Sequence, residues 1–442
     1  MTSPNENAIA KRYGLIAGWG NYPLLIARAL KRKGHHVYCL GVAGHASSRQ
    51  LREICDVYRE MGIARFGTAV RFFRKHRVSE ATMAGKIFKK YLLRPGLIWR
   101  HFPDLYTFQT FFPLFLAGKS DLKDDTLLLT AAKAFERKGV KLIPATNIAP
   151  DLLMPHGILT RRSLSDNDYN DIRLAWPLVR EIGRLDFGQA VMVRDSKILA
   201  IEGIDGTDET ISRAGDITGG KPFTAIKVAK PNQDMRFDVP AVGVNTLEKM
   251  ASRGADILVI EANRTLCVDP KPEFIERANR LGMVVASLSE SELQINRSES
   301  PSDFKYGFSY LTKTRPTIRQ LNDLRLGIPV MRSLSRFGVG QAVTIRERSV
   351  LAVRSMVESR AQVINRTAKL FPDAFTVILG GFPAEENWAE LDTLLFEIKH
   401  SNTRMIAVDS TPSEKLLSSL IQDAESNQIA LVQISESFSK RF

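Results

Sequence analysis

The chain of 442 residues is longer than one hydrophobic core usually organises, so two or three domains are expected. With 44% hydrophobic and 25% charged residues it has the composition of an ordinary folded soluble protein. Its three widely separated cysteines argue against a disulfide framework or a zinc cluster and fit a reducing cytosol. The net charge of +14 favours an acidic partner, such as a phosphate ligand, an anionic membrane surface or a nucleic acid.

Residues 13 to 44 predict a strand, a glycine-rich turn, a helix and a second strand, which is the opening of a Rossmann-like domain. Gly18 and Gly20 lie in the turn, where glycine lets the backbone approach a phosphate at the start of the helix. Pro23 replaces the third glycine of the dinucleotide motif and no acid follows the second strand, so NAD is not expected. A nucleotide or sugar-phosphate site and a purely structural turn both remain open.

The most apolar uncharged run, residues 105 to 118, has about 14 residues against the roughly 20 that cross a bilayer. Residues 71 to 100 before it hold nine Lys or Arg and a single acid, Glu80. The two stretches either rest on an anionic membrane and guide acyl chains, or form a buried aromatic helix beside a solvated basic face. The first ten residues lack the pattern of a secretory signal, so we expect a cytoplasmic protein with peripheral contact with the cytoplasmic face of the membrane.

The expected fold class is α/β in three parts. A helix beginning near Asp124 and a strand at 140 to 144 close a Rossmann-like domain at 11–155. An α/β domain with a mixed sheet is expected at 156–290, where strands at 189–193 and 197–202 form a hairpin and Gly206 and Thr207 begin a helix. A linker at 291–311 precedes the third domain, at 312–442.

The third domain is a repeat of the second. Residues 170–174 (NDIRL) recur at 322–326 (NDLRL), and residues 188–191 (GQAV) recur identically at 340–343, in each case 152 positions later. The two stretches, called here the first and the second copy, should therefore share a fold.

The two copies differ in their charged residues. The acids of the first copy are replaced in the second, Glu202 by Arg354, Asp205 by Val357 and Asp208 by Arg360. A kept scaffold with a lost polar cluster is the pattern expected if the first copy is catalytic and the second is a degenerate, structural repeat.

The first copy combines carboxylates with cations, and this mixture suits phosphoryl chemistry. The carboxylates are Glu202, Asp205, Asp208, Asp234 and Asp238, and the cations are Lys227, Lys230 and Arg236. Mg²⁺ prefers carboxylate oxygens and activates water, while Lys and Arg stabilise charge on phosphate oxygens. Alternation predicts Asp234, Arg236 and Asp238 on one face of an extended segment. Neither a Ser/His/Asp triad nor a histidine-rich metal site is evident.

A series of motifs runs in order from about Tyr13 to about Ser289. It comprises the turn at 18–23, Gly85-Lys86-Ile87, residues 124–128 (DDTLL), 150–153 (PDLL), 183–190 (GRLDFGQA), 202–208 (EGIDGTD) and 233–240 (QDMRFDVP). These motifs resemble the LpxI family, the UDP-2,3-diacylglucosamine pyrophosphatases of lipid A biosynthesis. Where the family has Glu-Gly-Thr-Asp, this chain has residues 205–208 (DGTD), and residues 88–90 (FKK) stand where the family often has Arg-Pro.

The resemblance implies attack of water on the α-phosphorus of UDP-2,3-diacylglucosamine, a nucleotide-sugar lipid, with Mg²⁺ or Mn²⁺ as cofactor. The products would be UMP and 2,3-diacylglucosamine 1-phosphate. The implied catalytic residues are Asp238, Asp234 and Arg236, and the implied metal ligands are Asp125, Glu202, Asp205, Asp208 and Asp238. The implied substrate-binding residues are Gly18, Gly20, Lys86, Gln189, Thr207, Lys227, Lys230 and Gln233.

A second interpretation is a non-catalytic nucleotide-sugar or lipid-binding protein with a decayed pyrophosphatase fold. No nucleic-acid partner is expected, because the basic residues are not interleaved with a known recognition motif. The sequence leaves room for a homodimer, and we expect the second copy to bury an interface.

Overall fold

The computed structural model describes residues 10–87, 101–116, 124–231, 233–237, 239–293, 306–381, 388–409 and 413–436. The chain divides into two compact units. The first comprises residues 1–154, 233–243 and 263–274, and the second comprises 155–232, 244–262 and 275–442. Residues 233–243 and 263–274 thus belong to the unit of the N-terminal domain. The domains expected from the sequence were contiguous and placed these two segments in the second domain.

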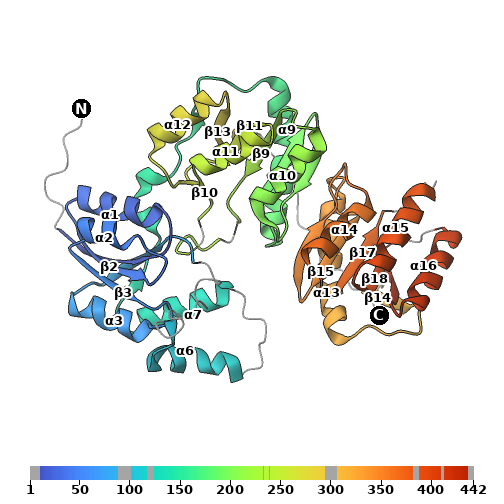
Figure 1. Ribbon diagram of the computed structural model, residues 1–442, viewed down its shortest axis with the longest axis horizontal. Helices are drawn as coiled ribbons and strands as arrows, with labels where there is room; N and C mark the ends of the chain where they lie inside the picture. Colours follow the sequence, from blue (N-terminus) through green and yellow to red (C-terminus); the bar gives the residue numbers. More distant parts are fainter. Residues whose placement is uncertain are drawn as a thin grey trace, which may run out of the picture. The chain divides into compact units, whose positions relative to one another are not determined.

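The first unit is built on a parallel sheet of strand order β3-β2-β1-β4-β5. Alternate residues of its strands enter two apolar clusters, one shared with helices α1 and α2 and the other with α3 and α7. Figure 1 shows these helix pairs on opposite faces of the sheet. The Rossmann-like prediction is therefore confirmed. The elements are β1 (Arg12–Ala17), α1 (Tyr22–Arg32), β2 (His36–Val42), α2 (Ser48–Ile54), β3 (Val57–Met61), α3 (Phe66–Lys75), β4 (Glu80–Ala84), α6 (Leu105–Leu116), α7 (Asp124–Glu136), β5 (Lys141–Leu142), α8 (Ala145–Ile148), β10 (Ala241–Val242) and β12 (Leu266–Cys267).

Helix α6 corresponds to the apolar run of the sequence and packs beside α3. It carries exposed apolar side chains at Leu105, Phe108 and Phe112, and Phe102 just before it is exposed as well. Along the described chain, no helix has both the length and the apolar character needed to cross a membrane.

The first copy of the repeat folds as a mixed sheet of order β6-β13-β11-β9-β7-β8. Strands β9, β11 and β13 are parallel, β7 and β8 form the predicted antiparallel hairpin at one edge, and β6 pairs antiparallel at the other. The elements are β6 (Gly157–Ile158), α9 (Asp166–Arg184), β7 (Ala190–Arg194), β8 (Lys197–Ile201), α10 (Gly206–Thr218), β9 (Phe223–Lys227), α11 (Val244–Ser252), β11 (Ala255–Glu261), α12 (Lys271–Arg280) and β13 (Val284–Leu288).

The second copy repeats this sheet as β14-β19-β18-β17-β15-β16, with the same parallel and antiparallel pairs. Even the irregularity in the hairpin recurs, between Met192 and Val193 in the first copy and between Thr344 and Ile345 in the second. The shared fold predicted from the repeat is therefore confirmed. The elements are β14 (Tyr306–Tyr310), α13 (Ile318–Ser335), β15 (Ala342–Arg346), β16 (Ser349–Val353), α14 (Arg360–Leu370), β17 (Phe375–Gly380), α15 (Trp388–His400), β18 (Thr403–Asp409), α16 (Glu414–Ser426) and β19 (Ala430–Glu436).

The repeated aspartate of the NDIRL and NDLRL segments has a structural role. The buried Asp171 carboxylate accepts a hydrogen bond of 2.6 Å from the Ser196 amide, in a hairpin turn whose two central residues, Asp195 and Ser196, have positive φ. Asp323 accepts from the Arg348 amide at 2.7 Å in the equivalent turn. Each carboxylate therefore holds a left-handed turn that side chains other than glycine adopt at a cost.

Helices α9 and α13 begin with the same N-terminal capping motif. Ser165 and Asp168 form a capping box at the start of α9, and Thr317 and Gln320 form one at the start of α13. Buried residues of both helices and of both sheets belong to one apolar cluster, which includes Trp176 of α9 and Leu324 of α13. The two copies thus share a hydrophobic core.

Candidate functional site

The first candidate region lies at the carboxyl ends of β1 and β4, where the strand order of the first sheet reverses. The Gly18 amide donates to the Ala84 carbonyl at 2.8 Å, and Trp19 and Lys86 exchange backbone hydrogen bonds of 2.9 and 3.0 Å. A Cβ on Gly18 would lie 2.8 Å from the Lys86 carbonyl oxygen, so only glycine fits, while Gly20 has a φ of +104°. Helix α1 begins directly after this turn, and such a switch point followed by a helix N-terminus is where open α/β sheets bind phosphates.

The segment containing Asp234 and Arg236 also belongs to the first unit. It is a turn, closed by a hydrogen bond of 3.0 Å from the Phe237 amide to the Asp234 carbonyl, so the extended alternating segment predicted from the sequence is wrong. The reason is a bidentate pair in which Arg236 Nε and Nη2 lie 2.9 and 2.6 Å from the two Asp234 oxygens. This contact lowers the pKa of the Asp234 carboxyl. Phe237 anchors the turn in the apolar cluster under α3 and α7.

Three further predicted residues belong to this unit. Lys86 is exposed and Gln233 is half-buried. Asp125 lies in the first turn of α7, although its side chain is outside the described residues. Asp238, the residue on which the catalytic prediction rests, also lies outside the described residues. The roles of these residues stay predictions.

The second candidate region is the carboxyl edge of the first copy's sheet. Glu202 follows β8, and its buried carboxylate accepts hydrogen bonds from the Gln189 amide at 2.8 Å and from the Thr207 hydroxyl at 2.9 Å. A Cβ on Gly188 would lie 2.5 Å from the Glu202 carbonyl oxygen, so this glycine permits the close approach of the two segments. Glu202, Gln189 and Thr207, predicted from separate motifs, are thus brought together.

Asp205 and Asp208 lie on either side of the start of α10, and their surroundings differ. The side chain of Asp205 is 1% exposed and forms an ion pair with Arg213 of α10. Its other oxygen accepts a hydrogen bond of 3.2 Å from the Gly203 amide. Asp208, in the first turn of α10, is exposed to solvent.

Lys227 and Lys230 lie at the carboxyl end of the neighbouring strand β9. Lys227 is its last residue, paired in register with Ala190, and Lys230 Nζ lies 2.8 Å from Asp186 Oδ1. The edge of the first copy therefore carries two half-buried lysines beside the buried Glu202. Such a mixture can bind the oxygens of a phosphate, because the lysines supply positive charge.

Arg180 and Glu261 also lie at this edge, although no motif of the sequence indicated them. Arg180 of α9 lies 3.4 Å from Glu261, the last residue of β11, and Glu261 also accepts from the Ala229 amide at 2.9 Å. The second copy has the same pair, Arg332 and Asp409, at 2.6 Å. Comparison of the two copies could have found the arginine, because Arg180 and Arg332 are 152 positions apart, but not its acidic partner, because Glu261 and Asp409 are not in that register.

The corresponding edge of the second copy is filled by arginines. Arg360, which replaces Asp208, is buried and donates to the carbonyls of Gly380 and Gly381 at the end of β17 at 3.0 and 2.7 Å. Arg354, which replaces Glu202, donates to Gln341 Oε1 at 2.7 Å. These arginines donate hydrogen bonds to backbone and amide oxygens at positions where the first copy has carboxylates. Internal contacts therefore occupy this edge of the second copy.

The predicted metal ligands do not form a cluster among the described side chains, where no three His, Cys, Asp or Glu residues are grouped as a metal site. Glu202 and Asp205 direct their oxygens to protein donors, and Asp208 alone of the three is exposed. Residues 202–208 by themselves therefore do not fit a three-carboxylate site, and the metal ion stays a prediction that depends on Asp125 and Asp238.

Comparison with known proteins agrees with this division of the chain. A family model described as the LpxI N-terminal domain matches residues 12–152, and one described as the LpxI C-terminal domain matches residues 155–286 and 308–380. A Caulobacter vibrioides protein named UDP-2,3-diacylglucosamine pyrophosphatase LpxI is 29% identical over 291 residues. The similarity covers 99% of that protein and 64% of this chain.

Proposed function

Because the chain belongs to the LpxI family, we propose that it hydrolyses the pyrophosphate bond of UDP-2,3-diacylglucosamine in lipid A biosynthesis. Water would attack the α-phosphorus, and the products would be UMP and 2,3-diacylglucosamine 1-phosphate. The observation that carries the proposal is the similarity to the Caulobacter protein over nearly its whole length, together with a first copy that keeps its carboxylates.

The chain's own residues suggest how the substrate would be bound. Gly18 and Gly20 shape the turn that leads into α1, and the amides at the start of this helix would bind a phosphate at the sheet's switch point. Lys227 and Lys230 supply positive charge that would stabilise the negative charge developing on the leaving phosphate. Glu202 fixes the segment that begins α10 through Gln189 and Thr207, so we assign it a positioning role.

A divalent ion, Mg²⁺ or Mn²⁺, remains part of the proposal through Asp238, with Asp125 and the exposed Asp208 as further candidates. When bound, such an ion supplies a polarised phosphate and a more acidic water. Asp234 is held by Arg236, so we expect this pair to orient the segment that leads to Asp238.

The test is turnover of UDP-2,3-diacylglucosamine by the full chain with Mg²⁺, with and without chelator, followed as UMP release. Asp238→Asn should lower kcat by about 100-fold or more, because phosphoryl transfer depends on correctly placed charge. Asp373→Asn, at an exposed carboxylate of the second copy, is the matched control and should behave as the native chain. Intact substrate with folded native protein would instead favour the non-catalytic binding protein.

We also propose peripheral contact with an anionic membrane through α6, since the lipid substrate resides there. Phe108 and Phe112 are 53% and 43% exposed, and their ring centroids lie 5.1 Å apart with the rings tilted by 32°. The neighbouring α3 carries exposed Arg71 and Arg74. Exposed aromatic and basic side chains together favour the surface of an anionic bilayer.

Sedimentation with phosphatidylglycerol vesicles tests this contact. Changing both Phe108 and Phe112 to Ser should reduce binding, whereas Phe396→Ser, at an equally exposed aromatic of the second copy, should not. Equal binding by all three proteins would contradict a contact through α6.

A further inference from the structure

The two copies contact each other through equivalent residues. Glu181 accepts a short hydrogen bond from the Ser333 hydroxyl, and these residues occupy the same position in the two copies, 152 residues apart. Arg184 and Arg336, another equivalent pair, both lie against Glu181, at 2.7 and 3.5 Å. An interface in which a position meets its own equivalent is the mark of two-fold symmetry between subunits.

The backbone contacts follow the same symmetry approximately. The Ile204 amide donates to the Leu351 carbonyl at 3.4 Å, and the amide of its equivalent, Met356, donates to the Ile198 carbonyl at 3.1 Å. A Cβ on Gly203 would lie 2.6 Å from the Leu351 oxygen, so glycine is required for this approach. The edge of the first copy that carries the candidate residues thus touches the second copy directly.

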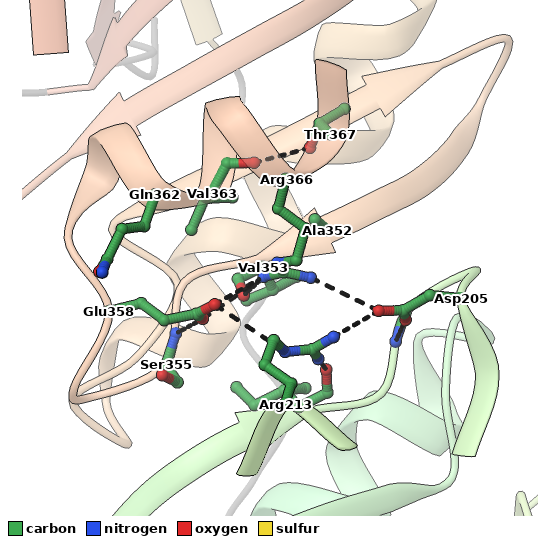
Figure 2. Close-up of polar contacts among 12 residues, drawn as sticks. Asp205, Arg213, Ala352, Val353, Ser355, Glu358, Gln362, Val363, Arg366 and Thr367 are labelled. Carbon is green, nitrogen blue, oxygen red and sulfur yellow. Dashed lines mark hydrogen bonds and ion pairs between the residues drawn. The ribbon is translucent and has the colours of Figure 1, made fainter. Parts of the chain in front are cut away.

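A quartet of charges lies at this contact, as Figure 2 shows. Asp205 pairs with Arg213 in the first copy, and Arg366 lies 3.2 Å from Glu358 in the second. Across the contact, Arg213 lies 3.9 Å from Glu358 and Arg366 lies 3.8 Å from Asp205. The four side chains are between 1% and 14% exposed, and their charges cancel.

We infer that the second copy serves as a built-in partner subunit that positions residues 202–208 of the first copy. Arg366 and Glu358 add ion pairs across the contact to Asp205 and Arg213, while the Leu351 carbonyl accepts a hydrogen bond from the Ile204 amide. A buried ion pair fixes geometry only while every member is present, because a charge left alone is strongly destabilising. The inference rests on the proposed function only in that this segment carries the candidate residues Glu202 and Thr207.

The test is hydrogen exchange of the full chain, read at the amides of Gly203 and Ile204, with Arg366→Leu. We expect exchange there to rise by about 10-fold or more, since these amides are held by Asp205 and Leu351, while exchange in β9 and β11 stays unchanged. Arg346→Leu is the control, because Arg346 at the end of β15 pairs with the exposed Asp373, which precedes β17 in the same copy. Arg366→Lys keeps the positive charge, so exchange at Gly203 and Ile204 should rise less than in Arg366→Leu.

Glu358→Gln keeps the side-chain shape and provides the same readout if Arg366→Leu unfolds the second copy. Equal exchange at Gly203 and Ile204 in the native chain, in Glu358→Gln and in the Arg346 control would overturn the inference. Exchange is measured without substrate, so a chain that fails to release UMP would refute the proposed function and leave this test intact. If the native chain is active, Arg366→Leu should lower kcat/KM, whereas Arg346→Leu should not.

Discussion

The two copies share a fold but differ in the residues at single equivalent positions. Glu202 and Arg354 occupy equivalent positions. Glu202 accepts hydrogen bonds from the Gln189 amide and the Thr207 hydroxyl, whereas Arg354 donates one to the Gln341 side chain. Both side chains secure the same glutamine-containing segment, yet only the first leaves a carboxylate at the sheet edge. A structural repeat can therefore keep its packing while losing the charge that phosphate chemistry needs.

In the first unit, Asp56 links stability to pH. Its burial opposes ionisation, but hydrogen bonds from the Val37 amide, His36 and Lys31 outweigh it and lower the pKa of Asp56 from 3.8 to about 2. Because the pKa of Asp56 is lower in the folded state, the ionised carboxylate stabilises the fold at pH values above 3.8, and this stabilisation is lost as the pH falls through about 2. Asp56→Asn should cost roughly 1 to 2 kcal/mol at pH 6 and little at pH 2, measured by urea unfolding. An equal cost at both values of pH would contradict the assignment.

At the scale of elements, the repeated hairpin tests the role of Asp171. Burial raises the pKa of this carboxyl, so its charge is itself a cost at neutral pH, but its oxygen satisfies the Ser196 amide. Asn would keep an acceptor, whereas Ala leaves the amide without a partner. We expect Asp171→Ala to be less stable than Asp171→Asn by about 1 to 2 kcal/mol in urea unfolding.

The second copy supplies an internal control for that prediction. Asp323 occupies the same position, is buried, and accepts from the Arg348 amide. Asp323→Ala should likewise be less stable than Asp323→Asn in urea unfolding. If Ala were as stable as Asn in both copies, the hydrogen bond would not be what holds the turn.

Much of the element structure could be predicted from the sequence because its signals are local. The glycine-rich turn after β1, the hairpin at 190–201 and the start of α10 at Gly206 follow from turn and cap residues. The segment around Asp234 could not, because alternation indicated a strand while the contact between Arg236 and Asp234 closes a turn. Arg213 was also missed, because its near partner Asp205 was interpreted as a metal ligand and its second partner, Glu358, is far away in the sequence.

At the scale of the whole chain, the contact between the copies should appear as an energetic coupling. Arg213→Met leaves Asp205 and Glu358 with one arginine, and Glu358→Gln leaves an excess of positive charge. Each change should cost about 3 kcal/mol, as expected for a broken buried pair. The double variant restores neutrality, so it should be more stable than additivity predicts by about 1 to 2 kcal/mol. Additive costs would show that the copies are not coupled through these charges.

The repeat also explains which conclusions needed the structure. Equivalent residues 152 positions apart predicted a shared fold, and the loss of three acids predicted that one copy is structural. The sequence could not show that equivalent positions such as Glu181 and Ser333 meet, because a repeat fixes what each copy looks like and not how the copies pack.

The central claim is that the first copy serves the chemistry and the second copy serves the structure. The most direct measurement compares Glu202→Gln with Arg354→Gln, equivalent positions in the two copies, as kcat/KM for UDP-2,3-diacylglucosamine on chains shown to be folded. We predict a loss of about 10- to 100-fold for Glu202→Gln, as for residues that orient functional groups, and an unchanged kcat/KM for Arg354→Gln. Equal losses, or a loss at Arg354 alone, would contradict the claim.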